Sequence, residues 1–255
     1  MSDSFSFDLN APYVRWWLAM TSPQISYGRH SYDYERLGMT RDQGIEASEL
    51  WRQELVEIWG IEHRFEWLEM IFRLAEARVH GQTWRSEFGR RACLTSSEWQ
   101  QRVSEVAGVV AQAEMRFLDT TYRQVGVVGF QAWDYCRATF LVRAGYELEV
   151  LSQSELAYLL NFIGQRVQAH FHSWEHYIKS FILGRTYWQY SVQDDPEKSI
   201  SGLLNDGLYQ AVSEFFYNLK QDKEALIFAI DWQTPLPSLM MPDSLDRDLE
   251  TMLEM

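Results

Sequence analysis

The sequence contains few cysteines and prolines, and it lacks the long apolar runs of membrane proteins. Its 255 residues include two cysteines, Cys93 and Cys136, and six prolines. Two distant cysteines without a Cys-x-x-Cys spacing favour reduced thiols over a disulfide framework, and therefore a reducing compartment. The longest apolar runs, such as residues 156–163, are far shorter than the roughly 20 residues that span a bilayer. We therefore predict a chain without a membrane-spanning segment.

The N-terminus lacks the pattern of a secretory signal. Residues 1–10 include acidic side chains, and no basic stretch followed by an apolar run occurs there. Together with the cysteine usage, this indicates a cytoplasmic protein.

Negative charge is in excess over the whole chain. The sequence has 36 Asp and Glu residues against 23 Lys and Arg residues, which gives a formal net charge of -13. Such a charge repels phosphate backbones and anionic lipids, so we expect neither nucleic acid nor a membrane as a partner. A basic protein partner fits the charge better. One local basic patch is predicted to be a solvated loop face, with anion binding as the alternative, and it comprises Arg78, His80, Arg85, Arg90 and Arg91.

Hydrophobic side chains recur at helical spacing along most of the chain. They make up 46% of the residues, which is enough for a core without disulfides. The spacing predicts helices over residues 13–20, 47–58, 65–79, 99–117, 130–144, 156–171, 174–188, 200–219 and 245–253. We predict a mostly α fold, a single compact multi-helix domain over residues 1–255. Its tail, about 231–255, is less regular, and a minor short strand at 226–230 is the only sheet element expected.

Capping residues mark several of the predicted helix ends. A Ser or Thr followed three residues later by Glu or Gln satisfies the free amides of a first helical turn. The pattern occurs at Thr40 and Gln43, at Thr95 and Glu98, and at Ser152 and Glu155, and Ser173 is a further cap. Gly81 is predicted to end the helix over 65–79, and residues 22–38 are predicted to form a loop.

Three groups of residues, in a fixed order, resemble a known family. They are Trp59-Gly60-Ile61, then Ala132-Trp133-Asp134-Tyr135-Cys136-Arg137 with Arg143-Ala144-Gly145-Tyr146, then Ser173-Trp174-Glu175 with Gly184-Arg185 and Trp188. Their order and spacing resemble the bacterial family named domain of unknown function 1266, over about residues 37–188, with a weaker similarity at 231–232. The resemblance implies a helical fold. It implies no reaction and no ligand.

The charged residues of these groups form the candidate site. Asp134 and Arg137 are three positions apart and therefore neighbours on one helix. Together with Arg143 and Arg185 they can form a pocket for a carboxylate or phosphate, because guanidinium groups present paired donors. The alternative is that these ions join helices within the core. Both interpretations include the neighbouring residues Trp133, Trp174, Glu175 and Trp188.

One short motif matches a zinc-protease pattern. Residues 172–176 read His-Ser-Trp-Glu-His, which is the inverted His-x-x-Glu-His motif. However, a cap at Ser173 would place His172 outside the helix and would spoil the spacing. We therefore predict no metal site. No cofactor is expected either, since phosphate-binding glycine loops and nucleophile elbows are missing from the sequence.

Acidity and the lack of catalytic motifs favour a non-catalytic binding protein. We predict an adaptor or an immunity-type protein that masks a basic protein partner. The alternative is an enzyme or small-anion binder with a pocket formed by Asp134, Arg137, Arg143 and Arg185. A concave pocket lined by these four side chains would favour the alternative, whereas a filled core would favour protein binding.

Overall fold

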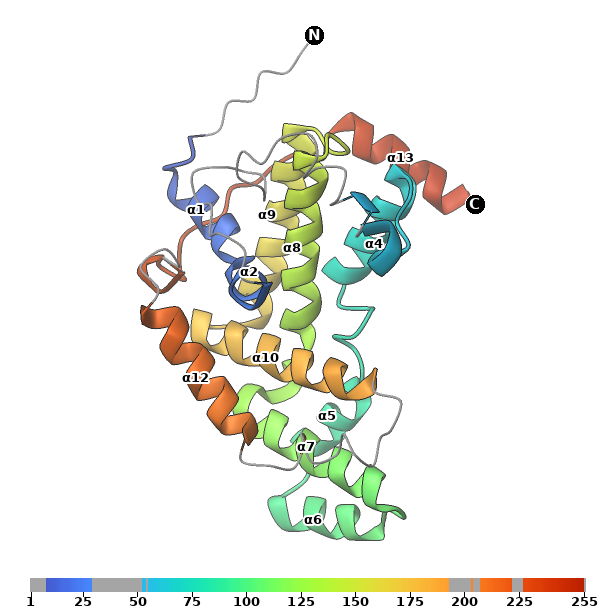
Figure 1. Cartoon of the computed structure of the whole chain (residues 1–255), viewed down its shortest axis with the longest axis vertical. Coiled ribbons are helices and arrows are strands. Elements are labelled where there is room, and N and C mark those ends of the chain that lie inside the picture. Colours follow the sequence, from blue (N-terminus) through green and yellow to red (C-terminus); the bar gives the residue numbers. More distant parts are fainter. Residues whose placement is uncertain are drawn as a thin grey trace. The chain divides into compact units, whose positions relative to one another are not determined.

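The computed structural model describes residues 8–28, 52–53, 55–192, 203, 207–221 and 227–254. Its regular elements are α1 (Pro12–Ala19), α2 (Ser22–Gly28), α4 (Arg64–Ala75), α5 (Arg85–Ala92), α6 (Ser96–Glu105), α7 (Val109–Val125), η1 (Gly126–Val128), α8 (Gln131–Glu147), α9 (Gln153–His170), α10 (Trp174–Ser191), α12 (Gly207–Gln221), η2 (Ile227–Ala229) and α13 (Asp243–Glu254) (Figure 1). All of these elements within the described ranges are helical, which confirms the mostly α prediction. No described helix is long and apolar enough to cross a membrane.

Three of the predicted caps are confirmed. In α6 the amide of Glu98 donates to Thr95 Oγ1 at 3.3 Å, and the amide of Thr95 donates to Glu98 Oε2 at 2.7 Å. Ser152 and Glu155 make the same reciprocal pair at the start of α9. The Ser173 hydroxyl accepts a hydrogen bond from the amide of His176 at the start of α10. The proposed cap at Thr40 and Gln43 lies outside the described residues.

Three local predictions are wrong. Part of the predicted loop over 22–38 is helix α2, in which Pro23 occupies the first turn, where a missing amide hydrogen costs nothing. Helix α4 ends at Ala75 and turns follow, so Gly81 does not end it. Residues 227–229 of the expected strand form the 3₁₀ turn η2, and an isolated short strand has no neighbour to pair with.

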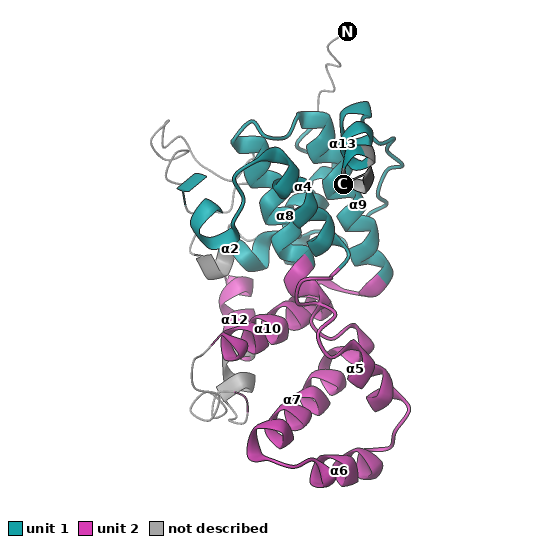
Figure 2. Ribbon diagram, turned by 90° about the vertical axis from the view of Figure 1, so that its right-hand side faces the viewer, with its two compact units in different colours: residues 1–76, 135–169, 224–255 teal, residues 77–134, 170–223 magenta. Residues whose placement is uncertain are grey.

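The chain divides into two compact units (Figure 2). Unit 1 comprises Met1–Glu76, Tyr135–Ala169 and Glu224–Met255, and unit 2 comprises Ala77–Asp134 and His170–Lys223. Helix α8 begins in unit 2 and continues in unit 1.

The core of unit 1 forms around α8 and α9, which lie side by side in Figures 1 and 2. Trp67 of α4 is 4% exposed, and its indole nitrogen donates to the Leu141 carbonyl of α8 at 3.0 Å. On α9, Gly164 allows a close approach, because a Cβ there would come within 3.1 Å of the Trp16 ring on α1. Burying these large rings adds to the hydrophobic stabilisation that the buried aliphatic side chains of this unit supply.

The core of unit 2 is a cluster of aromatic rings. Phe130 stacks on Tyr187 of α10 with centroids 5.1 Å apart, and it meets Phe88 of α5 edge-on at 5.4 Å. Helix α7 packs against α5, α6 and α10 around this cluster. Gly184 lets α10 approach closely, because a Cβ there would lie only 2.6 Å from Trp133 Cβ. The aromatic content of the sequence is therefore used for packing in this unit.

Candidate functional site

Asp134, the acidic residue of the predicted pocket, is held by backbone amides of its own unit. It is fully buried, and its Oδ2 accepts hydrogen bonds from the amides of Val79, His80 and Gly81 at 3.0, 2.8 and 2.7 Å. Ala77, just before these amides, has a left-handed φ of 57°, so the turn curls around the carboxylate. Such a nest of amides is a strong reason for a buried carboxylate in a purely structural role.

The two arginines of α8 belong to unit 1 and are also buried. Arg137 is 7% exposed, and its guanidinium carbon lies 5.4 Å from the centre of the Trp59 ring. Arg143 is 1% exposed and is among the largest fully buried side chains of the described residues. A buried guanidinium above an aromatic face is stabilised by the ring quadrupole, which accounts for Arg137 without a ligand.

The remaining predicted residues lie on α10 or beside it in unit 2. Arg185 is partly exposed and donates to Gln189 Oε1 at 2.9 Å. Trp133 and Trp188 pack together with ring centres 5.6 Å apart, whereas Trp174 is 4% exposed. Glu175 is exposed on the first turn of α10. The structure thus brings Trp133 and Trp188 together. The anion pocket of Asp134, Arg137, Arg143 and Arg185 stays a prediction.

The two histidines of the zinc-protease pattern lie against each other with their rings tilted by 32°. Their ring centres are 4.1 Å apart, and the Ser173 cap lies between them in sequence. His176 Nε2 is 3.0 Å from the Val125 carbonyl, and burial, the main cause, lowers the pKa of its imidazole. Among the described residues, no group of three or more His, Cys, Asp or Glu side chains is placed to hold a metal ion.

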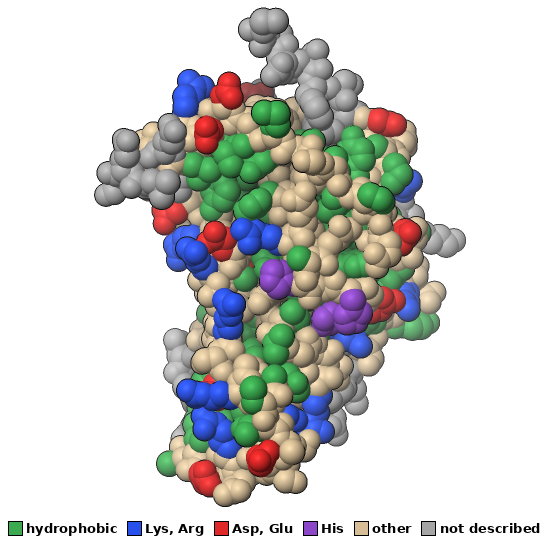
Figure 3. Space-filling model, turned by 180° about the vertical axis from the view of Figure 1, so that it is seen from behind, with side chains coloured by type: hydrophobic (Ala, Val, Ile, Leu, Met, Phe, Trp, Pro, Cys, Tyr) green, Lys and Arg blue, Asp and Glu red, His purple; other side chains and the backbone are tan. Residues whose placement is uncertain are grey.

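The predicted basic patch is divided between exposed and buried arginines. Arg85 and Arg90 are exposed, and Figure 3 shows that Lys and Arg side chains gather in groups on the face that it draws. Arg91, however, is 6% exposed, and its Nε donates to Asp119 Oδ1 at 2.6 Å. Its guanidinium also lies 4.9 Å from the Tyr122 ring centre. Arg91 therefore joins α5 to α7 and is not part of a solvated loop face.

A groove in unit 1 was not predicted from the sequence. It lies between α9 and the start of α13 and has a volume of about 630 Å³. We call it the α9–α13 groove, and its lining residues are Ser154, Ala157, Tyr158, Leu239, Met240, Met241, Pro242, Asp243, Ser244 and Arg247. Met240 is 93% exposed, the highest value among the exposed large hydrophobic residues of the described chain. The groove therefore combines an open apolar surface with polar ends of two helices.

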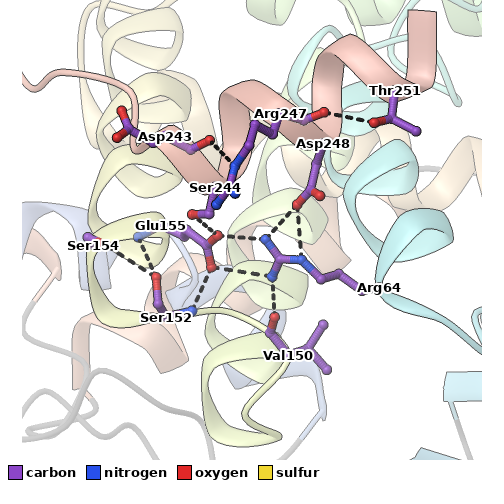
Figure 4. Close-up of polar contacts among 10 residues, drawn as sticks. All are labelled: Arg64, Val150, Ser152, Ser154, Glu155, Asp243, Ser244, Arg247, Asp248 and Thr251. Atoms are coloured by element: carbon purple, nitrogen blue, oxygen red, sulfur yellow. Dashed lines mark hydrogen bonds and ion pairs between the residues drawn. The ribbon is translucent and has the colours of Figure 1, made fainter. Parts of the chain in front are cut away.

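One wall of the groove is fixed by an ion cluster around Arg64 (Figure 4). The guanidinium donates to Glu155 Oε1 at 2.6 Å, to Asp248 Oδ2 at 2.8 Å and to the Val150 carbonyl. Ser244 of α13 donates to the same Glu155 oxygen at 2.6 Å. Since Arg64 is on α4, Glu155 on α9 and Asp248 on α13, the cluster joins three helices.

Charge and burial together set the electrostatics around the groove. Burial opposes ionisation of Glu155, but hydrogen bonds from Arg64, Ser244 and Ser152 outweigh it and lower the pKa of the carboxyl. The pKa of the Tyr158 hydroxyl is raised, first by burial and then by the negative charge of Asp246. The Glu155 carboxylate is thus fully engaged within the protein, whereas Asp246 is exposed beside the groove.

Long sequence separations explain why the residues around the groove were missed. Arg64 is 91 positions from Glu155 and 184 from Asp248. The Ser152 and Glu155 cap was the only local signal, and it predicts a helix start without indicating a groove.

Comparison with known proteins identifies relatives of uncharacterised function. Residues 54–232 match the model of a family described as "Protein of unknown function (DUF1266)". Uncharacterized protein YbeR of Escherichia coli (strain K12) is 28% identical over 181 residues, which cover 71% of this chain and 76% of YbeR. Uncharacterized protein YbeU of the same organism is 27% identical over 183 residues, with the same shares of both chains. No solved structure gives a significant match.

Proposed function

The chain belongs to the DUF1266 family, and from this premise and the geometry of unit 1 we propose that it is a non-catalytic binding protein of the bacterial cytoplasm. The α9–α13 groove is proposed to receive a basic, partly apolar segment of a protein partner. The observation that supports this proposal is the exposed Met240 side chain at a groove beside acidic residues. Flexible thioether side chains adapt to differently shaped partners, so they are common at binding surfaces.

Charge complementarity supports a basic partner. Asp243 lines the groove, and Asp246 is close enough to raise the pKa of Tyr158, which also lines it. Arg247 directs its Nε to the Asp243 carbonyl at 3.2 Å, which ties that cation to the start of α13. A lysine or arginine of the partner can therefore approach the carboxylates, and the net charge of -13 favours its encounter.

The alternative function, an enzyme or small-anion binder, draws less support from the described contacts. It needs Asp134 for chemistry or for shaping a pocket, but one oxygen of that carboxylate already accepts three backbone amides. It also needs the guanidinium of Arg137, which lies against the Trp59 ring. A protein-binding groove requires no such rearrangement of buried charges.

Fluorescence anisotropy with designed peptides tests the proposal. The probe is a labelled 12-residue peptide of lysine and leucine, and its control replaces every leucine with serine at the same charge. At 0.15 M salt, where the screening length is about 8 Å, charge alone should give weak binding. We expect saturable binding of the Lys/Leu peptide only.

Two variants with the same added charge separate groove binding from general attraction. Met240→Glu places a carboxylate in the groove, whereas Val109→Glu places one on the exposed start of α7. We expect Met240→Glu to weaken binding at least tenfold, because burying a methionine contributes roughly 1.5–3 kcal/mol and each 1.4 kcal/mol is about a factor of ten. Val109→Glu should leave binding unchanged or slightly tighter. Equal effects of the two variants, or equal binding of the Lys/Ser peptide, would contradict the proposal.

A further inference from the structure

The segment between η2 and α13 crosses unit 1 without regular structure. We call residues 231–242 the strap. It contains three prolines, Pro235, Pro237 and Pro242, and none of its residues from 234 to 242 is in a helix or a strand. In Figure 1 this part of the chain passes α1 and runs along α9 to reach α13. A stretch outside helices and strands that lies on a helix surface needs partners for its backbone groups.

Side-chain amides of α9 supply these partners. Gln168 Nε2 donates to the carbonyls of Trp232 and Thr234 at 3.1 and 2.9 Å, and Asn161 Nδ2 donates to the Pro237 carbonyl at 2.8 Å. Gln165 Nε2 makes a longer contact of 3.4 Å with the Pro237 carbonyl. Positions 161, 165 and 168 follow the spacing of one helix face. The strap backbone is therefore bound by side chains, as in recognition of a peptide.

Alternate side chains of the strap point into the protein. Trp232 is 9% exposed and Thr234 is 7% exposed, whereas Gln233 and Pro235 are exposed. The Trp232 ring lies 5.6 Å from the Trp16 ring, and Trp16 Nε1 donates to the Trp232 carbonyl at 3.2 Å. Residues 231–234 form a turn, in which the Thr234 amide donates to the Asp231 carbonyl at 3.2 Å, so the strap begins with a turn that carries Trp232 and Thr234 as anchors.

A small residue on α9 completes the docking surface. At Gly164, a Cβ would come within 3.0 Å of Leu236 Cδ1, so a larger residue there would push this leucine away from the helix by a few tenths of an ångström. Leu236 is thus a third anchor after Trp232 and Thr234. Gly164 lies between the amide donors Asn161 and Gln168, and the helix face therefore offers both a depression and hydrogen-bond donors.

We propose that this face of α9, together with Trp16, is a docking site for a proline-containing segment of a protein partner that begins with a turn and continues without helix or strand, and that the strap occupies the site in cis. The partner segment has an aromatic anchor, smaller anchors two and four residues later, and prolines near them. Prolines favour the extended form before binding, which lowers the ordering cost. Covalent attachment gives the strap a high effective concentration, so a partner competes well only when the strap is weakened or the partner is abundant.

Peptide binding in trans tests the proposal on the full chain. The probe is a fluorescein-labelled peptide of residues 231–242, with a scrambled peptide as its control. A strap-weakened chain carries Thr234→Gly and Leu236→Gly, which remove two anchors and leave α9 unchanged. We expect it to bind the peptide at least tenfold more tightly than the wild-type chain does. Adding Gln168→Leu should reverse most of this gain, because two carbonyls lose their donor.

Several outcomes would overturn the proposal. The first is a strap-weakened chain that retains its circular dichroism spectrum but does not bind the peptide, and the second is equal binding of the scrambled peptide. A wild-type dimer that Gln168→Leu dissociates would assign the site to strap exchange between copies. If the glycine variant does not fold, wild-type chain is crosslinked to millimolar peptide that carries a benzophenone residue at the Leu236 position. Labelling of α9 would support the site, whereas labelling that is confined to other parts of the chain would refute it.

Discussion

Asp134→Ala is the substitution for which the structure gives the clearest expectation. The change removes a fully buried carboxylate whose Oδ2 accepts three amides, at 2.7 to 3.0 Å. Alanine removes the acceptor of those three amides, and of the three hydrogen bonds the one from Gly81 is fully buried. The cost is therefore the desolvation of the amides in addition to the loss of the hydrogen bonds.

The magnitude follows from the number and type of these bonds. A hydrogen bond to a charged group contributes roughly 1.5–3 kcal/mol, and three full losses would exceed what most single substitutions cost. The amides of Val79 and His80 are only partly buried, so water can reach them after the change. We therefore expect Asp134→Ala to lower the free energy of unfolding by about 3–5 kcal/mol. Asp134→Asn keeps one acceptor oxygen and should cost about 1–2 kcal/mol.

Urea denaturation followed by tryptophan fluorescence measures both variants. For a chain of this size, about 3–5 kcal/mol corresponds to a melting temperature lowered by roughly 10 °C. Glu175→Ala, which changes an exposed carboxylate, is the matched control and should cost about 0.5 kcal/mol or less. Wild-type stability of Asp134→Ala, combined with a loss of binding to a small anion such as phosphate, would refute the structural role and favour the pocket of Asp134, Arg137, Arg143 and Arg185.

Three further predictions concern other contacts. Glu155→Gln should lower the free energy of unfolding at pH 7 by about 1–3 kcal/mol, which is less than a fully buried pair would cost because Arg64 is 34% exposed. Since the folded-state pKa of Glu155 is lowered, its contribution is full above about pH 5 and is lost as the pH falls, so urea titrations should converge for wild type and Glu155→Gln in acid. Gly184→Ala should destabilise by about 1–3 kcal/mol, since its Cβ would meet Trp133 Cβ at 2.6 Å, whereas Gly89→Ala at an exposed position of α5, with no atom within 4 Å, should stabilise slightly. Burial raises the pKa of Glu114, and the hydrogen bond from the Tyr190 hydroxyl partly offsets this effect. Tyr190→Phe should therefore raise the pKa of Glu114 further, and an NMR titration of the labelled carboxyl that shows no upward shift would contradict this prediction.

Local contacts explain which parts of the fold were predictable. The caps at Thr95, Ser152 and Ser173 were found because each hydrogen bond joins residues three positions apart. Helical periodicity was equally informative, since it shows which side of a helix is buried. It does not show which element covers that side. The turns after Ala75 were therefore missed, although the buried Asp134 carboxylate shapes them from 53 to 55 positions away.

The candidate site was harder to predict than the fold, for the same physical reason. The site was predicted from the charged residues within the family-like groups. Asp134 does have specific hydrogen-bond partners, but they are backbone amides, which every residue type except proline carries, so the sequence does not reveal them. The α9–α13 groove, in contrast, depends on Met240 remaining exposed between two elements. Sequence alone cannot show whether a methionine in an irregular segment is exposed or buried, because such a segment has no periodicity that marks its buried side.

The Arg64 cluster relates the stability of unit 1 to the proposed groove. The Glu155 side chain is 3% exposed, whereas that of Asp248 is 37% exposed, although both accept hydrogen bonds from Arg64. Solvent screens the Asp248 pair, so it contributes little to stability, and the buried Glu155 carboxylate is the main anchor of Arg64 and Ser244. Because Ser244 also lines the groove, the position of the groove wall depends on Glu155 more than on Asp248. Peptide binding should consequently weaken in Glu155→Gln and remain close to wild type in Asp248→Asn, and the reverse order would show that the exposed pair holds α13 in place.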